Sequence, residues 1–185
     1  MRKWNALISA AVMLLFLVHC ITGALQMLGF LEGGNPFLKI LTYLMLALVV
    51  LHAAIGIALT AETLRLIRKS GASYKRGNEL FWLRRISGGA LVFLIAAHVF
   101  MLSLAGQNPV RLKPFEGPQL LLSLLLVLAL LLHLLSNVRP LMIALGISGL
   151  RDFVKDLLIV LAVVLLFAGC AFAVYYLRWN IVWRP

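Results

Sequence analysis

The sequence predicts an all-α polytopic membrane protein with five transmembrane helices, and three observations lead to that fold class. Hydrophobic residues occupy 63% of the 185 positions and charged residues only 12%, whereas about 25% of the residues in soluble domains are charged. The apolar residues gather in five stretches, each long enough for the roughly 20 residues that a helix needs to cross a bilayer. The polar remainder is too short to fold separately, so we expect residues 1–185 to form one membrane domain.

The five predicted helices cover residues 5–30, 37–66, 82–105, 118–146 and 153–177. The first is too long for the apolar part of a signal peptide, and no small-residue cleavage pattern follows it, so we expect it to be retained. Residues 29–36 are rich in turn formers, and Pro36 suits the first turn of the second helix. Arg68, Lys69 and Gly71 favour the end of that helix. The prolines of residues 107–118 and the glycines of residues 146–149 separate the remaining helices.

The positive charge is distributed unevenly between the two sides of this arrangement. The net charge is +11, which by itself could suggest a nucleic-acid-binding protein. Twelve of the 17 lysines and arginines fall on the side of the N-terminus and five on the other. Because cationic residues stay on the cytoplasmic side of a membrane, we expect the N-terminus in the cytoplasm, the C-terminus outside and no nucleic-acid partner. We expect the lysines and arginines on the cytoplasmic side to contact anionic lipid headgroups or an acidic partner instead.

The chain contains four histidines, and each lies in a different one of the first four predicted helices: His19, His52, His98 and His133. An ionisable ring at membrane depth is costly, so it indicates a functional site. Imidazole is also a common protein ligand of haem iron. Four rings make two pairs, and two pairs can hold two haem b groups. The predicted core is therefore a four-helix haem-binding bundle, with a peripheral fifth helix that has no histidine.

Counting residues from the outer helix ends indicates which histidines pair. His19 is 13 residues from Glu32, and His98 is nine residues from Gln107. His52 and His133 lie 16 and 15 residues from the prolines that open their helices, several ångströms deeper at about 1.5 Å per residue. We therefore predict an outer haem between His19 and His98 and an inner haem between His52 and His133.

Other interpretations of the histidines remain open at this point. A single intramembrane histidine often donates an interhelical hydrogen bond or relays protons. A zinc site needs three or four ligands at one depth, whereas these histidines lie at two. Cys20 and Cys170 are inside predicted helices, which argues against a disulfide framework, and we expect both to be small buried hydrophobic residues.

Smaller and charged residues near the histidines complete the predicted sites. Gly23 and Gly56 each follow a histidine by four positions and would leave room on that helix face for a bulky planar group. At the inner interface, Arg84 and Arg85 could bind the anionic haem propionates in bidentate fashion, and the Ser87 hydroxyl could donate to them.

Several short segments together resemble a known family. They are residues 52–56 (His-Ala-Ala-Ile-Gly), Tyr74, residues 85–88 (Arg-Ile-Ser-Gly), His98, residues 133–137 (His-Leu-Leu-Ser-Asn) and residues 146–148 (Gly-Ile-Ser). With His19 and five spans, their order resembles the di-haem cytochrome b membrane anchor of succinate dehydrogenases and fumarate reductases. The resemblance covers nearly the whole chain and is clearest from His52 to Ser148.

The resemblance implies a subunit of an enzyme complex in the cytoplasmic (inner) membrane of a prokaryote. Its expected partners are a flavoprotein with FAD and an iron–sulfur protein on the cytoplasmic face, and such complexes can form higher oligomers. The chain would pass electrons between these subunits and a membrane quinone, usually menaquinone. It would hold two haems with the same histidine pairing as the depth count.

Two features qualify this expectation. Some family members carry intramembrane acidic residues linked to proton movement, but here all six acidic residues lie at helix ends or in loops, so we do not expect that proton route. A quinone also needs a proton donor or acceptor near its headgroup, and Gln26 and Glu32 are the outer candidates. The alternatives are the cytochrome b subunit of another oxidoreductase, such as a hydrogenase or formate dehydrogenase, and a haem-free carrier or assembly factor with a histidine proton relay.

Overall fold

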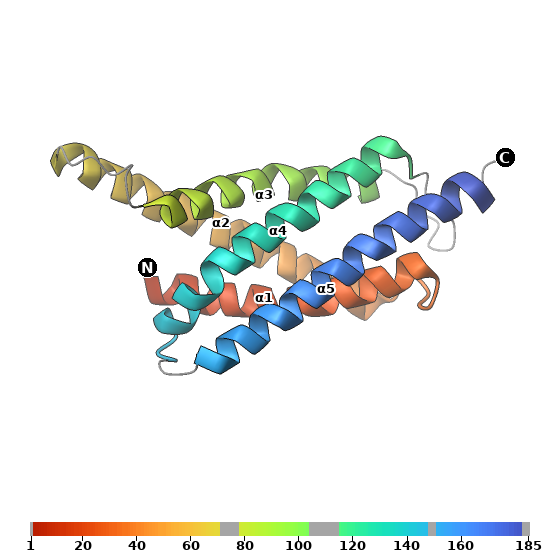
Figure 1. The fold of residues 1–185 in the computed structure, drawn as a ribbon, viewed down its shortest axis with the longest axis horizontal. Helices are drawn as coiled ribbons and strands as arrows, with labels where there is room; N and C mark the ends of the chain where they lie inside the picture. Colours follow the sequence, from red (N-terminus) through yellow and green to blue (C-terminus); the bar gives the residue numbers. More distant parts are fainter. Residues whose placement is uncertain (1, 71–77, 104–114, 148–150, 183–185) are drawn as a thin grey trace.

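The computed structural model describes residues 2–70, 78–103, 115–147 and 151–182. Its helices are α1 (Arg2–Leu28), α2 (Pro36–Ser70), α3 (Glu79–Ser103), α4 (Gly117–Ala144) and α5 (Arg151–Leu177), and a short π-helical turn (Arg178–Val182) follows α5 (Figure 1). There is no strand in these ranges. All five helices are long and apolar enough to cross a membrane, which confirms the predicted all-α polytopic fold.

Local sequence signals set the helix ends. Gly29 follows α1 with a φ of 84°, and the Phe30 amide donates to the Leu25 carbonyl at 2.9 Å. This is a Schellman motif, which satisfies carbonyls that the end of a helix leaves unpaired; the same pattern follows α4. The Asn35 side chain accepts a hydrogen bond from the Phe37 amide at 2.9 Å, so α2 begins with a capping asparagine followed by a proline.

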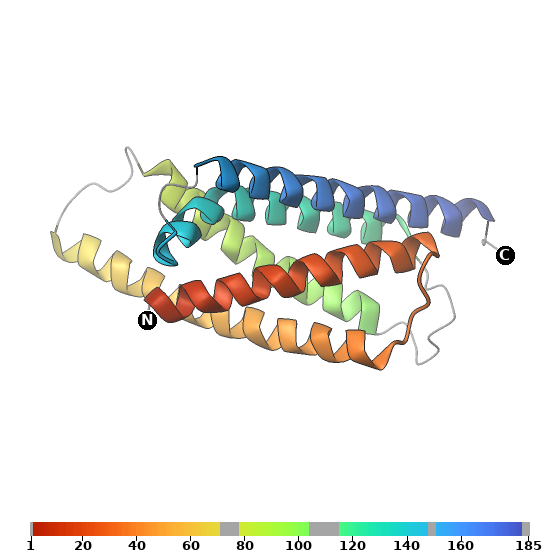
Figure 2. The same ribbon diagram turned by 90° about the horizontal axis from the view of Figure 1, so that it is seen from below.

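The helices form a ring that is loosely closed at one place. α1 packs on α2 and α5, α5 packs on α4, and α4 packs on α3, whereas α2 and α3 barely touch. The two views in Figures 1 and 2 show the helices running along the long axis of the molecule, with the termini at opposite ends. An odd number of spans requires that placement of the termini.

The fifth helix was predicted to be peripheral, but it lies in a more central position. α5 lies against both α1 and α4. Its buried residues are Leu161, Leu165, Ala168, Ala171, Phe172 and Tyr175. α5 therefore belongs to the packed core, although it carries no histidine, because its small and apolar residues fill the side of the ring between α1 and α4.

Large apolar side chains cover much of the outer surface. Phe93 is 78% exposed, Tyr43 70% and Leu166 69%, and α2 has no buried residue at all. Soluble monomers rarely expose apolar patches of this extent. This surface is suited to contact with lipid hydrocarbon.

The second helix is longer than a bilayer crossing needs. α2 contains 35 residues, or about 50 Å at 1.5 Å per residue, compared with a hydrocarbon core of about 30 Å. Its last turns carry Arg65, Arg68 and Lys69 and project past the other helices at the end where the N-terminus lies (Figures 1 and 2). The cationic end of α2 therefore extends beyond the apolar part of the bundle.

Candidate functional site

The four histidines come together as two close pairs inside the bundle. The ring centroids of His19 on α1 and His98 on α3 are 6.5 Å apart, with ring planes at 84°. Those of His52 on α2 and His133 on α4 are also 6.5 Å apart, with planes at 79°. These are the two pairs that the depth count predicts. That they bind iron remains a prediction.

The separation within each pair suits one metal ion between two imidazoles. A metal–imidazole bond is about 2.0–2.1 Å long and a ring nitrogen lies about 1 Å from its centroid, which places the two centroids about 6 Å apart. A direct hydrogen bond, with nitrogens about 3 Å apart, would bring the centroids to about 5 Å. No hydrogen bond joins the two rings of either pair, all four of which lie in the described helices. The separation is thus wider than a direct hydrogen bond and leaves room for one metal ion; it is also the separation of an ordinary edge contact, such as the 6.4 Å between His98 and Phe172.

Three of the histidines also contact a hydroxyl group through Nδ1. His19 Nδ1 lies 3.3 Å from Thr42 Oγ1, and His52 Nδ1 lies 3.1 Å from Ser9 Oγ. His133 Nδ1 lies 3.2 Å from Ser87 Oγ. Such contacts orient a ring and leave its Nε2 nitrogen available. Ser9 and Thr42 were not among the predicted site residues, and Ser87 was predicted to contact a propionate instead.

The ring of His98 has a different environment. It lies against Phe172 of α5, with centroids 6.4 Å apart and planes at 82°, and Phe172 stacks on Phe115 with planes at 3°. Within the described ranges, the His98 ring has no hydrogen bond. Aromatic packing from α5 thus contacts this ring. The sequence did not predict that contact, because α5 carries no histidine.

The surroundings of His133 are tighter. A Cβ atom built on Gly88 would lie 3.3 Å from His133 Cε1, so only glycine lets α3 approach the ring without displacement. Asn137 Nδ2 donates to the His133 carbonyl at 2.7 Å and lies 3.5 Å from Nδ1. His133 is therefore positioned by both α3 and α4.

The helix faces next to the first two histidines are open. No atom lies within 4 Å of a Cβ built on Gly23 or on Gly56. Because each glycine follows a histidine by four positions, this space lies on the histidine side of its helix. Gly89 is open in the same way, so the presence of a planar group beside Gly23 and Gly56 stays a prediction.

The two arginines at the start of α3 have different environments. Arg84 Nε donates to the Ser136 carbonyl at 2.9 Å, which joins α3 to α4. Arg85 lies over the Phe81 ring at 5.1 Å, and its buried Nε has no hydrogen-bond partner in the described ranges. Arg85 thus has unused donor capacity, whereas Arg84 is engaged in helix packing.

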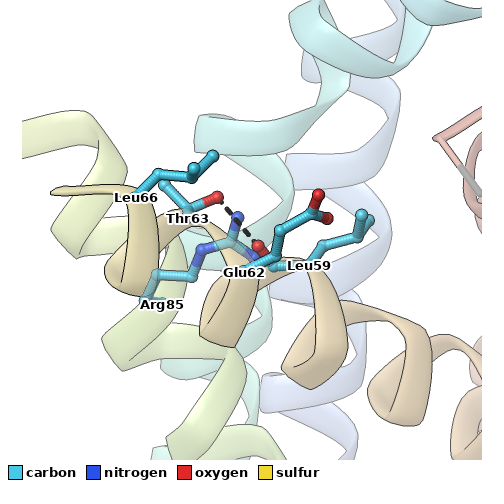
Figure 3. A pocket seen from close by; sticks show the side chains of 5 residues that line it. All are labelled: Leu59, Glu62, Thr63, Leu66 and Arg85. Atoms are coloured by element: carbon cyan, nitrogen blue, oxygen red, sulfur yellow. Dashed lines mark hydrogen bonds between the residues drawn. The ribbon is translucent and has the colours of Figure 1, made fainter. Parts of the chain in front are cut away.

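Arg85 lines a cavity of about 220 Å³ between α2 and α3 (Figure 3). The rest of the lining comes from one face of α2: Leu59, Glu62, Thr63 and Leu66. The Thr63 hydroxyl donates to the Leu59 carbonyl at 2.8 Å, and no salt bridge joins Arg85 to Glu62 among the described side chains. The cavity therefore combines the Arg85 guanidinium and the Glu62 carboxylate with the hydroxyl of Thr63 and two leucine side chains.

The outer quinone candidates lie at the opposite end from this cavity. Gln26 is half-buried in the last turn of α1, and Glu32 is exposed in the loop that follows. Arg178, after α5, donates to the Leu28 carbonyl at 2.8 Å and so closes the end of α1. A quinone contact at Gln26 or Glu32 stays a prediction.

Neither a disulfide nor a multi-ligand metal cluster occurs in the described part of the chain. Cys20 and Cys170 are free, Cys20 partly buried and Cys170 exposed, so Cys170 is not the buried residue that was expected. No group of three or more histidine, cysteine, aspartate or glutamate side chains gathers there. No family model, curated protein or solved structure matches this chain.

Proposed function

We propose that this chain is a di-haem cytochrome b membrane anchor. In this role His19 and His98 bind the iron of an outer haem, and His52 and His133 bind that of an inner haem. The chain passes electrons between membrane quinone and a flavoprotein with an iron–sulfur partner, of the succinate dehydrogenase or fumarate reductase type.

One observation carries the haem proposal: the 6.5 Å separation of ring centroids in two independent histidine pairs. The separation is too wide for a ring-to-ring hydrogen bond and matches two metal–imidazole bonds. Each pair supplies only two protein ligands, as a bis-histidine haem requires, whereas a structural zinc ion takes four. The same spacing at both levels favours the same chemistry at both.

The space around the pairs supports a large planar cofactor. The positions next to Gly23 and Gly56 are open, and α2 and α3 barely touch although each contributes a histidine. A bound haem would supply the one-electron Fe³⁺/Fe²⁺ chemistry, and these side chains would set its orientation and potential. A group held between α2 and α3 would also replace contacts that these helices do not make with each other.

Arg85 is the best-supported partner for an inner-haem propionate. Its buried Nε lacks a partner and an unpaired buried cationic donor is costly, so a carboxylate there would offset that cost. Arg84 and Ser87, the other expected partners, already bond to the Ser136 carbonyl and to His133. We therefore assign the propionate contact first to Arg85; the terminal nitrogens of Arg84 can take part as well, because only its Nε bonds to Ser136.

The soluble partners follow from the resemblance and from the charge distribution. With the N-terminus in the cytoplasm, the projecting cationic end of α2, which carries Arg65, Arg68 and Lys69, faces the compartment in which the flavoprotein and iron–sulfur subunits would dock. His52 and His133 would hold the haem nearer to these subunits, and His19 and His98 would hold the haem nearer to a quinone on the far side.

The test is a spectrum of the full-length protein isolated from membranes in mild detergent. We expect reduced-minus-oxidised bands of b-type haem and two haems per chain. His52→Ala and His133→Ala should delete one and the same haem, and His19→Ala and His98→Ala the other. A wild-type protein without haem overturns the proposal. If the His52 and His98 variants lost the same haem, the pairing would be wrong. Co-purification of a flavoprotein with an iron–sulfur protein, rather than a hydrogenase or formate dehydrogenase, tests the partner assignment.

A further inference from the structure

The four histidine-bearing helices share a second feature that the haem proposal does not use. Each carries a serine or threonine ten or eleven positions before its histidine. The pairs are Ser9 and His19, Thr42 and His52, Ser87 and His98, and Ser123 and His133. Ten residues of helix span about 15 Å. When two such helices pack antiparallel, the hydroxyl of each therefore comes level with the histidine of the other.

The first two helices form this arrangement reciprocally. Ser9 of α1 contacts Nδ1 of His52 on α2, and Thr42 of α2 contacts Nδ1 of His19 on α1. α3 and α4 form it once, through Ser87 and Nδ1 of His133. Ser123 has the same spacing but no hydrogen bond to the His98 ring in the described ranges; its hydroxyl donates to the Gln119 carbonyl at 2.8 Å.

The backbone bonds of the three contacting hydroxyls reveal the direction of these contacts. Ser9 donates to the Asn5 carbonyl at 2.7 Å, Thr42 to the Leu38 carbonyl at 2.9 Å, and Ser87 to the Leu83 carbonyl at 2.7 Å. A hydroxyl has one hydrogen to donate. With that hydrogen on the backbone, the hydroxyl oxygen is left to accept from its histidine, which favours the tautomer with the hydrogen on Nδ1. At His133 the donor-only Nδ2 of Asn137 also lies 3.5 Å from Nδ1 and competes with Ser87 for that nitrogen.

We propose that Ser9, Thr42 and Ser87 are positioning residues that hold His52, His19 and His133 as the Nδ1–H tautomer, so that Nε2 of each ring binds the haem iron. This inference rests on the proposed function and adds an asymmetry to it. The inner pair has two hydroxyl acceptors, whereas the outer pair has one, on His19, and Phe172 holds the remaining ring.

The asymmetry has a measurable electronic consequence. An acceptor on the far nitrogen makes a ligating imidazole more basic, which stabilises ferric over ferrous iron and lowers the midpoint potential. Loss of the acceptor should therefore raise the potential of the haem that its histidine holds. A role in helix packing alone would not produce a shift confined to one haem.

The experiment is a redox titration of both haems in the full-length purified protein, with each haem identified by the histidine variants above. We expect Ser9→Ala and Ser87→Ala to raise only the inner potential and Thr42→Val to raise only the outer one. Ser9→Thr, which keeps a hydroxyl, should remain near wild type. Loss of the inner haem in Ser9→Ala, with its retention in Ser9→Thr, would support the same assignment.

Two control variants distinguish the loss of a hydroxyl–histidine contact from other effects of removing a hydroxyl group. Thr60 of α2 makes the same backbone bond, to the Gly56 carbonyl at 2.6 Å, but contacts no histidine ring, so Thr60→Val should shift neither potential. Ser123→Ala should also shift neither, because Ser123 shares only the spacing. A shift of the outer potential in Ser123→Ala would overturn the asymmetry. If the wild-type protein holds two haems but Ser9→Ala, Thr42→Val and Ser87→Ala leave both midpoint potentials unchanged, this inference is wrong and the haem proposal stands. If the wild-type protein holds no haem, both are wrong.

Discussion

At the scale of single residues, the inner histidine pair has very little free space on one side. His133 lies between the Ser87 hydroxyl and the α carbon of Gly88, where a methyl group would approach to 3.3 Å. Protein interiors accommodate such intrusions only by moving side chains or backbone. The identity of residue 88 therefore controls the position of the His133 ring.

Gly88→Val should displace His133 and lower the haem content from two per chain towards one. Gly89→Val is the matched control, because nothing lies within 4 Å of a Cβ on Gly89, and it should retain both haems. Pyridine haemochrome analysis of the two purified variants measures the difference. Equal haem content in both would mean that the approach of Gly88 to His133 does not matter for binding.

At the scale of helices, the cavity between α2 and α3 is the clearest consequence of their slight contact. A cation with a buried, unpaired Nε borders it. If the proposed haem lies between these two helices, Arg85 would be near enough to bind one of its anionic groups.

Arg85→Gln should lower the midpoint potential of the inner haem, because loss of a nearby positive charge favours the more positive ferric state. The outer haem, held at the other end of the bundle, should change little. Arg139→Gln removes an exposed cation near the same end and should leave both potentials close to wild type, because solvent screens it. Redox titration at low ionic strength checks this, and an unchanged inner potential in Arg85→Gln would argue against the propionate assignment.

At the scale of the whole molecule, the distribution of charge over the five spans predicts an orientation. The cations concentrate around the end that holds the N-terminus and the projecting part of α2 (Figure 1). The C-terminus lies at the opposite end. A bundle with this charge bias should insert with the N-terminal end in the cytoplasm.

An alkaline phosphatase domain fused after residue 185 should be active, because this enzyme matures only outside the cytoplasm. The same domain fused before residue 1 should be inactive. Activity assays in intact cells, normalised to the amount of fusion protein, distinguish the two orientations. Activity of the N-terminal fusion alone would reverse the topology and exchange the inner and outer assignments.

Much of the fold could be predicted because its signals are local. Apolar runs, Gly29, Pro36 and Gly146 define where helices start and stop, and the helix ends agree with the prediction to within a few residues. The pairing of the histidines could also be predicted, because the distance of a residue from the end of its helix follows from counting along the chain.

The packing of the helices decided the features that counting residues along the sequence could not predict. Side-chain contacts between segments far apart in the chain determine how each helix is rotated and which helices are neighbours. Only the folded bundle therefore placed α5 in the core, put Phe172 against His98 and left the Nε of Arg85 without a partner while that of Arg84 bonds to the Ser136 carbonyl. The spacing of Ser9, Thr42 and Ser87 was present in the sequence, but its meaning depends on which helices pack antiparallel. The sequence alone determined five apolar helices and the position of each histidine along its helix, because both follow from counting residues, and the tertiary structure decided which hydroxyl or aromatic group lies against each ring.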